Sequence, residues 1–178
     1  PELYCSNMSR IEEHYTHGHD PVVVTAHARR TAAEAAAFLL PRLRAGMRVL
    51  DFGCGPGSIT AGLADHVLPS GRVVGIDNSP DAIAIASAGR EDRFNLDYQV
   101  ASVYELPFDD DSFDAAYAHQ TLQHLGNPVA ALVEIRRVLQ PEGVVGVRDS
   151  DFGTMTHFPH YDQLDTWLDL YQRVARAN

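Results

Sequence analysis

The chain has 178 residues, 45% of them apolar, which is enough for one domain with a sizeable hydrophobic core. Its formal net charge of −10 argues against nucleic acid as a partner, because proteins that bind nucleic acid need a basic face for the phosphates. All 14 residues of the lysine and arginine class are arginine, so Schiff-base chemistry, which requires a lysine amine, is excluded.

No apolar run approaches the length of a membrane span, and the first residues lack the basic and then apolar pattern of a secretion signal. The two cysteines are Cys5, near the start of the chain, and Cys54, within a glycine-rich turn. A structural disulfide between them is therefore not expected. These features predict a cytoplasmic protein without a membrane span.

Residues 1–24 are polar, contain several histidines and are weakly periodic, which predicts an N-terminal arm or lid. His14, His17 and His19 match no usual zinc-binding spacing, and no metal site is predicted there. Residues 25–178 are expected to form one Rossmann-like domain, because no linker, repeat or low-complexity tract divides them.

Amphipathic helices alternate with apolar strands through the rest of the chain. In chain order we expect a helix over 25–44, a strand over 48–52, a helix over 59–66, a strand over 72–76, a helix over 80–88, strands over 96–101 and 113–118, a helix over 128–139, a strand over 144–148 and a helix over 161–177. Such alternation is typical of βαβ units. The fold class is therefore predicted to be α/β, a doubly wound, mostly parallel sheet with helices on both faces.

Local signals refine two of these elements. Thr31 to Glu34 resembles a capping box within the first predicted helix, and Pro41 is expected to kink or end that helix. Pro141, Glu142 and Gly143 are expected to form a turn that leads into the fifth strand.

The stretch from residue 49 to residue 60 reads as a buried strand that turns sharply into a helix. Three alternate glycines, Gly53, Gly55 and Gly57, allow a tight bend and a close approach of a ligand to the main chain. The following helix offers unpaired N–H groups to an anionic group. The same pattern is also compatible with a tight turn that binds nothing.

Asp77 ends the next apolar strand, about 20 residues downstream, where a dinucleotide-type fold places the carboxylate that binds a ribose. Ser79 and Pro80 supply the expected N-cap and first position of the following helix. Asp77 is therefore predicted to be available to a ligand rather than to cap that helix.

Five segments occur in an order that resembles the motifs of class I S-adenosylmethionine-dependent methyltransferases. They are residues 51–57 (DFGCGPG), 75–79 (GIDNS), 106–109 (LPFD), 114–116 (DAA) and 137–143 (RVLQPEG). The subgroup that they resemble most is the small-molecule type that includes the ubiquinone and menaquinone C-methyltransferases. The resemblance implies S-adenosyl-L-methionine as the cofactor, with S-adenosyl-L-homocysteine as the product.

The resemblance also implies roles for the residues of the first motif. The three glycines, together with Cys54 between them, would surround the methionine end of the cofactor. Asp51 would orient the ammonium group of the cofactor, directly or through water.

Further residues are implied for the other end of the cofactor. Asp77 would bind the ribose hydroxyls, and Asn78 would lie against the adenine. The family usually has an acidic residue after the third strand that binds the adenine amino group, whereas this chain has Ser102 followed by Val103. A hydroxyl accepts that bond weakly, so adenine recognition is expected to rest more on backbone groups. Tyr15, in the arm, would close over the cofactor.

His119 follows the fourth strand, where the family places residues that face the reactive methyl group. Methyl transfer is an in-line displacement, so catalysis is mostly alignment, and a base is needed only if the acceptor carries a proton. Histidine suits such a base near neutral pH. Two interpretations of His119 stay open: a catalytic base, or a residue that simply contacts the methionine carboxylate or packs under the arm.

Two other function classes are compatible with parts of the sequence. A nicotinamide-dependent oxidoreductase would require glycine or alanine at position 58 of its fingerprint, where this chain has Ser58. A non-catalytic cofactor-binding module would carry the same motifs as an enzyme. The order of the motifs favours a methyltransferase that acts on a small-molecule acceptor.

The methyltransferase family sheet has seven strands, and the last two form an antiparallel pair beside the fifth. This sequence yields five strands and one further helix, so we expect a fragment, or the ordered part, of a longer protein. As a whole chain, it would expose residues 144–147 as a strand edge and the apolar side of the helix at 161–177 as a patch. Either surface would favour a homo-oligomer.

Overall fold

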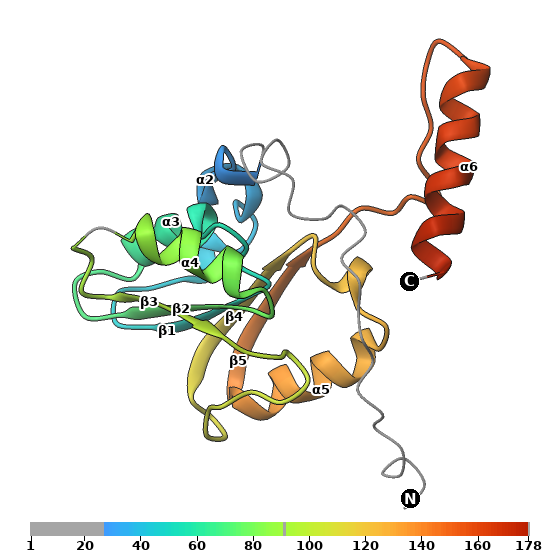
Figure 1. Ribbon diagram of the computed structural model, residues 1–178. Helices are drawn as coiled ribbons and strands as arrows, with labels where there is room; N and C mark the ends of the chain where they lie inside the picture. Colours follow the sequence, from blue (N-terminus) through green and yellow to red (C-terminus); the bar gives the residue numbers. More distant parts are fainter. Residues whose placement is uncertain (1–26, 91, 178) are drawn as a thin grey trace, which may run out of the picture.

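The computed structural model describes residues 27–90 and 92–177 (Figure 1). The arm predicted for residues 1–24, with Cys5, Tyr15 and its histidines, lies outside the described residues. The boundary between that arm and the domain predicted for residues 25–178 therefore stays a prediction.

A parallel sheet forms the centre of the molecule. Its strands are β1 (Arg48–Phe52), β2 (Arg72–Asp77), β3 (Leu96–Val100), β4 (Phe113–His119) and β5 (Leu139–Arg148). Their spatial order is β3-β2-β1-β4-β5, and each neighbouring pair is parallel. The order reverses between β1 and β4. In open α/β sheets, ligands bind beyond the carboxyl ends of the strands at such a switch point.

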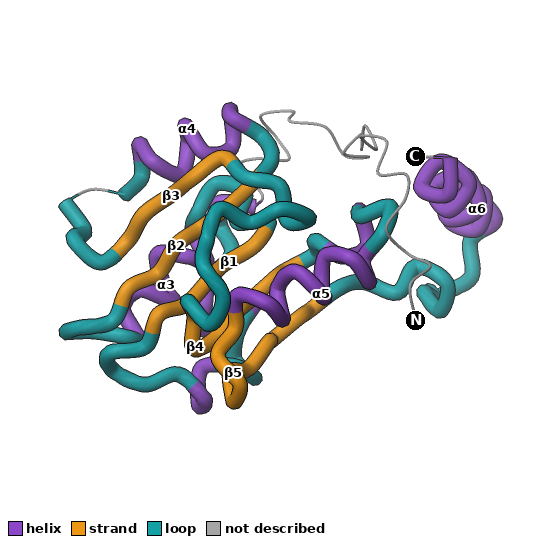
Figure 2. The backbone as a smooth tube through the Cα atoms, turned by 90° about the horizontal axis from the view of Figure 1, so that it is seen from below, coloured by secondary structure: helices purple, strands orange, loops and turns teal. Residues whose placement is uncertain are grey.

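Helices cover both faces of this sheet. They are α2 (Ala32–Ala35), α3 (Ser58–His66), α4 (Pro80–Ala88) and α5 (Pro128–Val138), with short 3₁₀ turns η1 (Leu40–Arg42) and η2 (Leu122–His124). A further helix, α6 (Asp162–Ala177), follows β5 and does not cover the sheet. Figure 1 shows α3 and α4 on one face and α5 on the other, and Figure 2 shows α5 running alongside β5. The predicted doubly wound α/β class is confirmed. None of the described helices is long and apolar enough to cross a bilayer.

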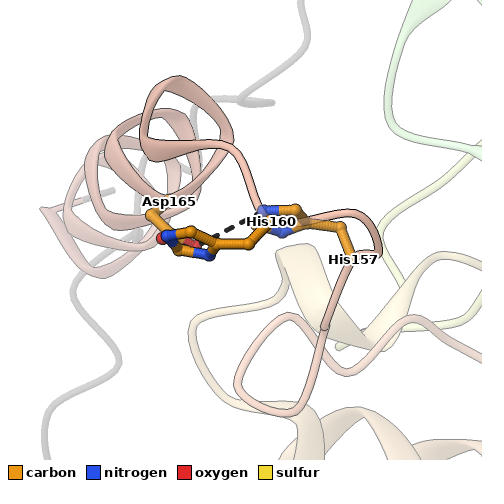
Figure 3. Close-up of side chains that lie close together, drawn as sticks. All are labelled: His157, His160 and Asp165. Atoms are coloured by element: carbon orange, nitrogen blue, oxygen red, sulfur yellow. Dashed lines mark ion pairs between the residues drawn. The ribbon is translucent and has the colours of Figure 1, made fainter.

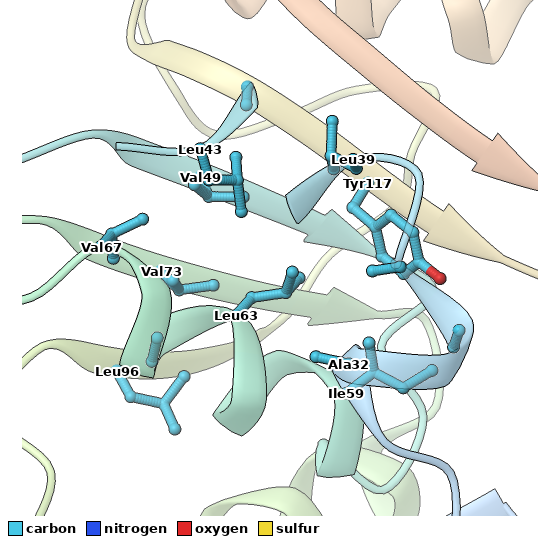
Figure 4. Close-up of a cluster of buried hydrophobic side chains, with 14 residues drawn as sticks. Ala32, Leu39, Leu43, Val49, Ile59, Leu63, Val67, Val73, Leu96 and Tyr117 are labelled. Atoms are coloured by element: carbon cyan, nitrogen blue, oxygen red, sulfur yellow. The ribbon is translucent and has the colours of Figure 1, made fainter. Parts of the chain in front are cut away.

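Two apolar clusters fill the space between the helices and the sheet. The first packs α2 and α3 onto one face and includes the fully buried side chains of Leu63 and Val49 (Figure 4). The second packs α5 onto the opposite face and includes Leu50 and Ile135. Val49 and Leu50 are neighbours in β1 whose side chains point to opposite faces, as strand geometry requires. Burial on both faces explains why these strands read as continuous apolar runs.

The helix predicted for residues 25–44 is wrong in extent. The chain leaves a helical conformation at Arg30, and α2 then spans only four residues before the 3₁₀ turn. Thr31 has extended backbone angles and caps α2, accepting a hydrogen bond from the Glu34 N–H. The capping box therefore begins a new helix inside the predicted one, and Pro41 stands in the 3₁₀ turn. The capping signal was correct, and the inference of one continuous helix was not.

The turn predicted at residues 141–143 is instead part of β5, which begins at Leu139 rather than Val144. Leu139 pairs with Phe113 and Val144 pairs with Ala115, so the residues between them form a bulge without reversing the chain. Proline and glycine are compatible with a bulge on an edge strand, because the missing N–H and side chain cost little there.

The final part of the chain departs from the packed core. In the described sheet β5 pairs with β4 alone, and Val145 is 47% exposed. Helix α6 stands away from the sheet (Figure 1), and its side chains Leu164, Trp167 and Val174 are each about half exposed. The ring of Phe152, in the preceding loop, packs on Tyr171 of α6 with centroids 4.3 Å apart.

Candidate active site

A cavity of about 410 Å³ opens at the carboxyl ends of β1, β2, β3 and β4. Among the residues predicted for the site, those that line it are Asp51, Gly53, Cys54, Gly55, Asp77, Asn78, Ser102, Val103 and His119. They come from four separate segments of the chain, which the parallel sheet brings to one edge. Of the predicted site residues within the described chain, Gly57 alone does not line the cavity.

The glycine turn is built from left-handed backbone. Gly53, Gly55 and Gly57 have φ values of 74°, 53° and 82°, a region that side chains with a Cβ rarely adopt. A Cβ placed on Gly55 would meet no protein atom within 4 Å, so its backbone faces open space in the cavity. A ligand can therefore approach the main chain closely at this position.

Gly57 serves packing at the back of the turn. A Cβ there would collide with the side chain of Tyr98 on β3, whose hydroxyl donates to the Gly57 carbonyl at 3.0 Å. Gly57 is also the N-cap residue of α3. The absence of a side chain at Gly57 thus lets Tyr98 of β3 form a hydrogen bond with the N-cap residue of α3.

Asp51 is a buried carboxylate, only 2% exposed, at the end of β1. Its Oδ2 accepts a hydrogen bond of 2.6 Å from Thr60 Oγ1 on α3. Burial and the nearby Asp77 carboxylate raise the pKa of Asp51 to about 7, although the Thr60 hydrogen bond opposes this rise. A cation in the cavity would favour the ionised form.

Asp77 joins the end of β2 to the glycine turn. Its Oδ2 accepts from the Gly55 N–H at 3.0 Å, and its Oδ1 accepts from the Ser79 N–H at 2.9 Å. Ser79 caps α4 as predicted, accepting from the Ala82 N–H. Asp77 is therefore engaged by the backbone, which the sequence did not indicate. Each oxygen retains acceptor capacity, because a carboxylate offers about four lone-pair positions.

The side of the cavity beyond Asp77 is more exposed. Asn78 and Ser102 are both exposed, and Val103 is half-buried beside them. Ser102 Oγ accepts a hydrogen bond of 3.2 Å from the Tyr104 N–H, which leaves its hydroxyl hydrogen and one acceptor position for a ligand.

Cys54 lies in the glycine turn with its thiol buried. Burial, followed by the carboxylates of Asp51 and Asp77, raises the pKa of Cys54 far above its usual range. The thiol therefore stays protonated and is not a nucleophile.

His119 stands at the carboxyl end of β4, at the border of the cavity. Burial lowers its pKa to about 4, and the positive charges of Arg30 and Arg148 contribute in the same direction. Its Nδ1 is buried and has no hydrogen-bond partner within the described part of the chain. The imidazole is therefore neutral at physiological pH and is a weak base.

A second, polar cavity of about 390 Å³ adjoins the first and shares Arg30, His119 and Gln120 with it. Arg148 of β5 and Glu34 of α2 also line this cavity, and the Arg148 guanidinium donates to the Glu34 carbonyl at 3.0 Å. Two cationic side chains thus border the space on the far side of His119.

Gln120 lies at the border between the two cavities and forms hydrogen bonds across it, and it was not predicted as a site residue from the sequence. Its Oε1 accepts from Arg30 at 2.6 Å, its Nε2 donates to Ser150 Oγ at 3.2 Å, and its N–H donates to the Arg148 carbonyl at 2.7 Å. Its φ of 54° is unfavourable for a residue with a Cβ, and such strain persists where the surroundings hold it, often at functional sites. The available sequence signal was its position directly after His119.

Comparison with known proteins identifies the family. A family model described as a methyltransferase domain matches residues 43–177. An uncharacterised methyltransferase of Schizosaccharomyces pombe is 34% identical over 169 residues, which cover 90% of this chain and 60% of that protein. This chain belongs to the methyltransferase-domain family. A demethylmenaquinone methyltransferase of Lactococcus lactis is 34% identical over 120 residues, covering 66% of this chain and 46% of the relative.

The fold comparison agrees with this assignment. The crystal structure of a S-adenosylmethionine-dependent methyltransferase from Aquifex aeolicus has a TM-score of 0.69 to this chain, with 22% identity and 88% of each chain covered. The resemblance to class I S-adenosylmethionine-dependent methyltransferases, inferred from the five motifs, is confirmed. The chain spans 60% and 46% of the lengths of the two curated relatives above.

Gly57→Ala should lower the free energy of unfolding by about 2–5 kcal/mol. The left-handed backbone costs a residue with a Cβ about 1–2 kcal/mol, and overpacking against Tyr98 adds about 1–3 kcal/mol. Gly55→Ala is the matched control, since it carries the backbone cost but meets open space. Urea unfolding followed by circular dichroism measures both, and equal losses in the two variants would contradict the packing role of Gly57.

Asp51→Asn should change how stability depends on pH. A pKa raised from 3.8 to about 7 means that the folded protein binds the proton more tightly than the unfolded chain, so wild-type stability falls as pH rises through this window. Asparagine cannot ionise, so the stability of the Asp51→Asn variant does not fall in this way. Relative to wild type, its free energy of unfolding should rise by at most about 4 kcal/mol between pH 4 and pH 8, at about 1.4 kcal/mol per pKa unit.

Urea unfolding at several pH values tests this expectation for Asp51. The control is Asp92→Asn, which changes an exposed carboxylate. If the stability difference between Asp51→Asn and wild type is the same at pH 4 and pH 8, the raised pKa of Asp51 is refuted.

Proposed function

We propose that the protein transfers a methyl group from S-adenosylmethionine, bound in the 410 Å³ cavity, to a small-molecule acceptor. The observation that carries this proposal is the convergence of Asp51, Asp77 and the open backbone of Gly55 at one cavity edge. Two carboxylates beside a glycine turn suit a cofactor that has an ammonium group, a sulfonium and a ribose diol.

The residues of the methionine and ribose region fit this cofactor. Asp51 would orient the ammonium group, whose positive charge would shift the carboxyl group toward its ionised form. Asp77 has acceptor capacity left for ribose hydroxyls, and the backbone of Gly53 and Gly55 would lie along the methionine part. Bound S-adenosylmethionine supplies an electrophilic methyl group. Gly57 is proposed to act on this region through Tyr98, without touching the cofactor.

The adenine would lie between the more exposed residues Asn78, Ser102 and Val103. Ser102 would either accept a hydrogen bond from the adenine amino group or donate its hydroxyl hydrogen to a ring nitrogen, because only one of its two acceptor positions is taken by a backbone N–H. Closure of Tyr15 over the cofactor stays a prediction, since that residue lies outside the described chain.

The acceptor is proposed to approach through the second, polar cavity. Arg30 and Arg148 line it together with the carboxylates of Glu34 and Asp149, so the two guanidinium groups would stabilise an anionic oxygen of the acceptor that lies beside them. His119 lies between the two cavities, and because its Nδ1 is buried, its Nε2 is the ring nitrogen that would align the acceptor by a hydrogen bond. Its low pKa favours this contact role over that of a general base.

Binding of S-adenosylhomocysteine tests the cofactor assignment. Isothermal titration calorimetry should show one site for S-adenosylhomocysteine and none for NADH. Asp77→Asn should weaken this binding by about 10- to 150-fold, because a hydrogen bond to a charged group contributes about 1.5–3 kcal/mol. Asp109→Asn, an exposed carboxylate outside the cavity, should leave it unchanged.

NADH binding with no affinity for S-adenosylhomocysteine would support an oxidoreductase instead. Wild-type affinity in a folded Asp77→Asn variant would refute the ribose role. Transfer of a labelled methyl group to members of a metabolite panel separates an enzyme from a non-catalytic binding module.

The ionisation of His119 separates its two possible roles. Nuclear magnetic resonance titration of the ring should give a pKa near 4, with the neutral form present throughout the physiological range. Methyl transfer should accordingly show no fall in rate between pH 8 and about pH 5 that depends on His119, and a fall caused by protonation of Asp51 should be the same in His119→Ala. His119→Asn, which keeps a hydrogen-bonding side chain, should retain more turnover than His119→Ala. A fall centred near pH 6.5 that is absent from the alanine variant would identify His119 as a general base.

A further inference from the structure

Two histidines and one aspartate converge at the start of α6, at positions that share no residue with either cavity (Figure 3). His157 and His160 come from the loop before the helix, and Asp165 comes from its first turn. Their potential ligand atoms all lie within 4.8 Å of one another. We propose that His157, His160 and Asp165 form a binding site for a divalent transition-metal ion, with Zn²⁺ as the reference ion.

The spacing of the side chains fits a small ion. His157 Nε2 lies 3.7 Å from Asp165 Oδ1, and His160 Nδ1 lies 3.3 Å from Asp165 Oδ2. In a tetrahedral zinc site, ligands about 2.1 Å from the ion are separated from each other by about 3.4 Å. Both separations, which end on different oxygens of Asp165, are close to this value, and one ligand atom from each residue lies within 4.8 Å of the others. The two imidazole rings lie side by side, with centroids 5.8 Å apart and planes 12° apart, and binding of an ion would require these side chains to rotate toward it.

A hydrogen bond to His157 identifies Nε2 as its unprotonated ring nitrogen, and a metal ion binds the unprotonated form. Nε2 accepts a hydrogen bond of 3.2 Å from the Tyr161 N–H, so this nitrogen is unprotonated when that bond forms. An ion would take the place of this donor. Tyr161 is 53% exposed and immediately precedes α6, so its N–H can turn to water.

Asp162 places the second histidine. Its Oδ1 lies 3.1 Å from His160 Nε2, on the opposite side of the ring from Asp165. A carboxylate that accepts from one ring nitrogen fixes the tautomer and directs the other nitrogen, which is the usual arrangement around a metal-binding histidine. With the proton on Nε2, the lone pair of Nδ1 faces Asp165, and a cation between these two acceptors removes their repulsion. The competing explanation is a protonated His160 that forms ion pairs with both aspartates.

The ligand set selects the class of ion. Two imidazole nitrogens and one carboxylate oxygen suit Zn²⁺, Ni²⁺ or Cu²⁺, whereas Mg²⁺ and Ca²⁺ prefer oxygen ligands alone. His160 and Asp165 have side chains 70% and 52% exposed, which leaves a fourth position open to water. All the ligands lie within residues 157–165, so the site depends only on local structure. A bound ion would tie the loop to the first turn of α6 and order the start of the helix.

Zinc titration of the intact chain tests this site. Wild type should bind one more equivalent of Zn²⁺ in isothermal titration calorimetry than the double variant His157→Ala/His160→Ala. Because other histidines can bind zinc, the matched control is His66→Ala, which removes an exposed histidine outside the cluster and should keep the wild-type stoichiometry at this site. Circular dichroism checks that each variant is folded.

Two conservative variants divide the roles of the aspartates. Asp165→Asn should abolish the additional equivalent, whereas Asp162→Asn should weaken it by about 10- to 100-fold through the orientation of His160. Excess Mg²⁺ should not compete. Equal zinc stoichiometry in wild type and the double variant would overturn the proposal and leave the cluster as ion pairs. Displacement of Zn²⁺ by Mg²⁺ at this site would overturn the assigned class of ion.

Discussion

The hydrogen bond from the Gly55 N–H to Asp77 Oδ2 is the contact on which the rest of the site depends. It joins the turn after β1 to the end of β2. The other oxygen, Asp77 Oδ1, accepts a hydrogen bond from the N–H of Ser79, the N-cap residue of α4. The turn stays open because Gly55 has no side chain, while Tyr98 holds the opposite side of the turn at Gly57. One carboxylate therefore shapes the cavity and also faces it. A substitution at position 77 would change both the ligand contacts and the backbone that presents them.

The two cavities differ in their charged lining. Asp51 and Asp77 line the first cavity, where the burial of Asp51 and the proximity of Asp77 raise the pKa of Asp51 and cost stability at neutral pH. The second cavity combines Arg30 and Arg148 with Glu34 and Asp149, and the two arginines help to keep His119 neutral. A cation bound beside Asp51 would offset the stability cost there. In the second cavity the two guanidinium groups favour an anionic oxygen, and the two carboxylates oppose it.

The fold was predictable because its main determinants are local. The apolar runs, the glycine turn and the capping residue Ser79 each act within a few positions, and they placed four of the five strands and most helices within one or two residues. The order of the motifs then predicted which segments meet at the sheet edge. The two errors came from tertiary context. Thr31 begins a new helix where the alanine-rich pattern favoured continuation, and the bulge before Val144 depends on pairing with β4.

Finer features of the site depend on contacts between distant segments, which no short pattern encodes. A side chain is excluded at Gly57 because Tyr98, on β3, packs against it. The backbone of Gln120 is strained, and its side chain forms hydrogen bonds with Arg30 and Ser150. The cluster of His157, His160 and Asp165 differs, because its residues lie within nine consecutive positions. Their spacing nevertheless matches no usual helix-face pattern. The loop before the helix brings them together, so their proximity depends on the backbone conformation at the start of α6 and is not predicted by sequence periodicity. An ion held there would act on the start of α6, away from the residues that line the two cavities.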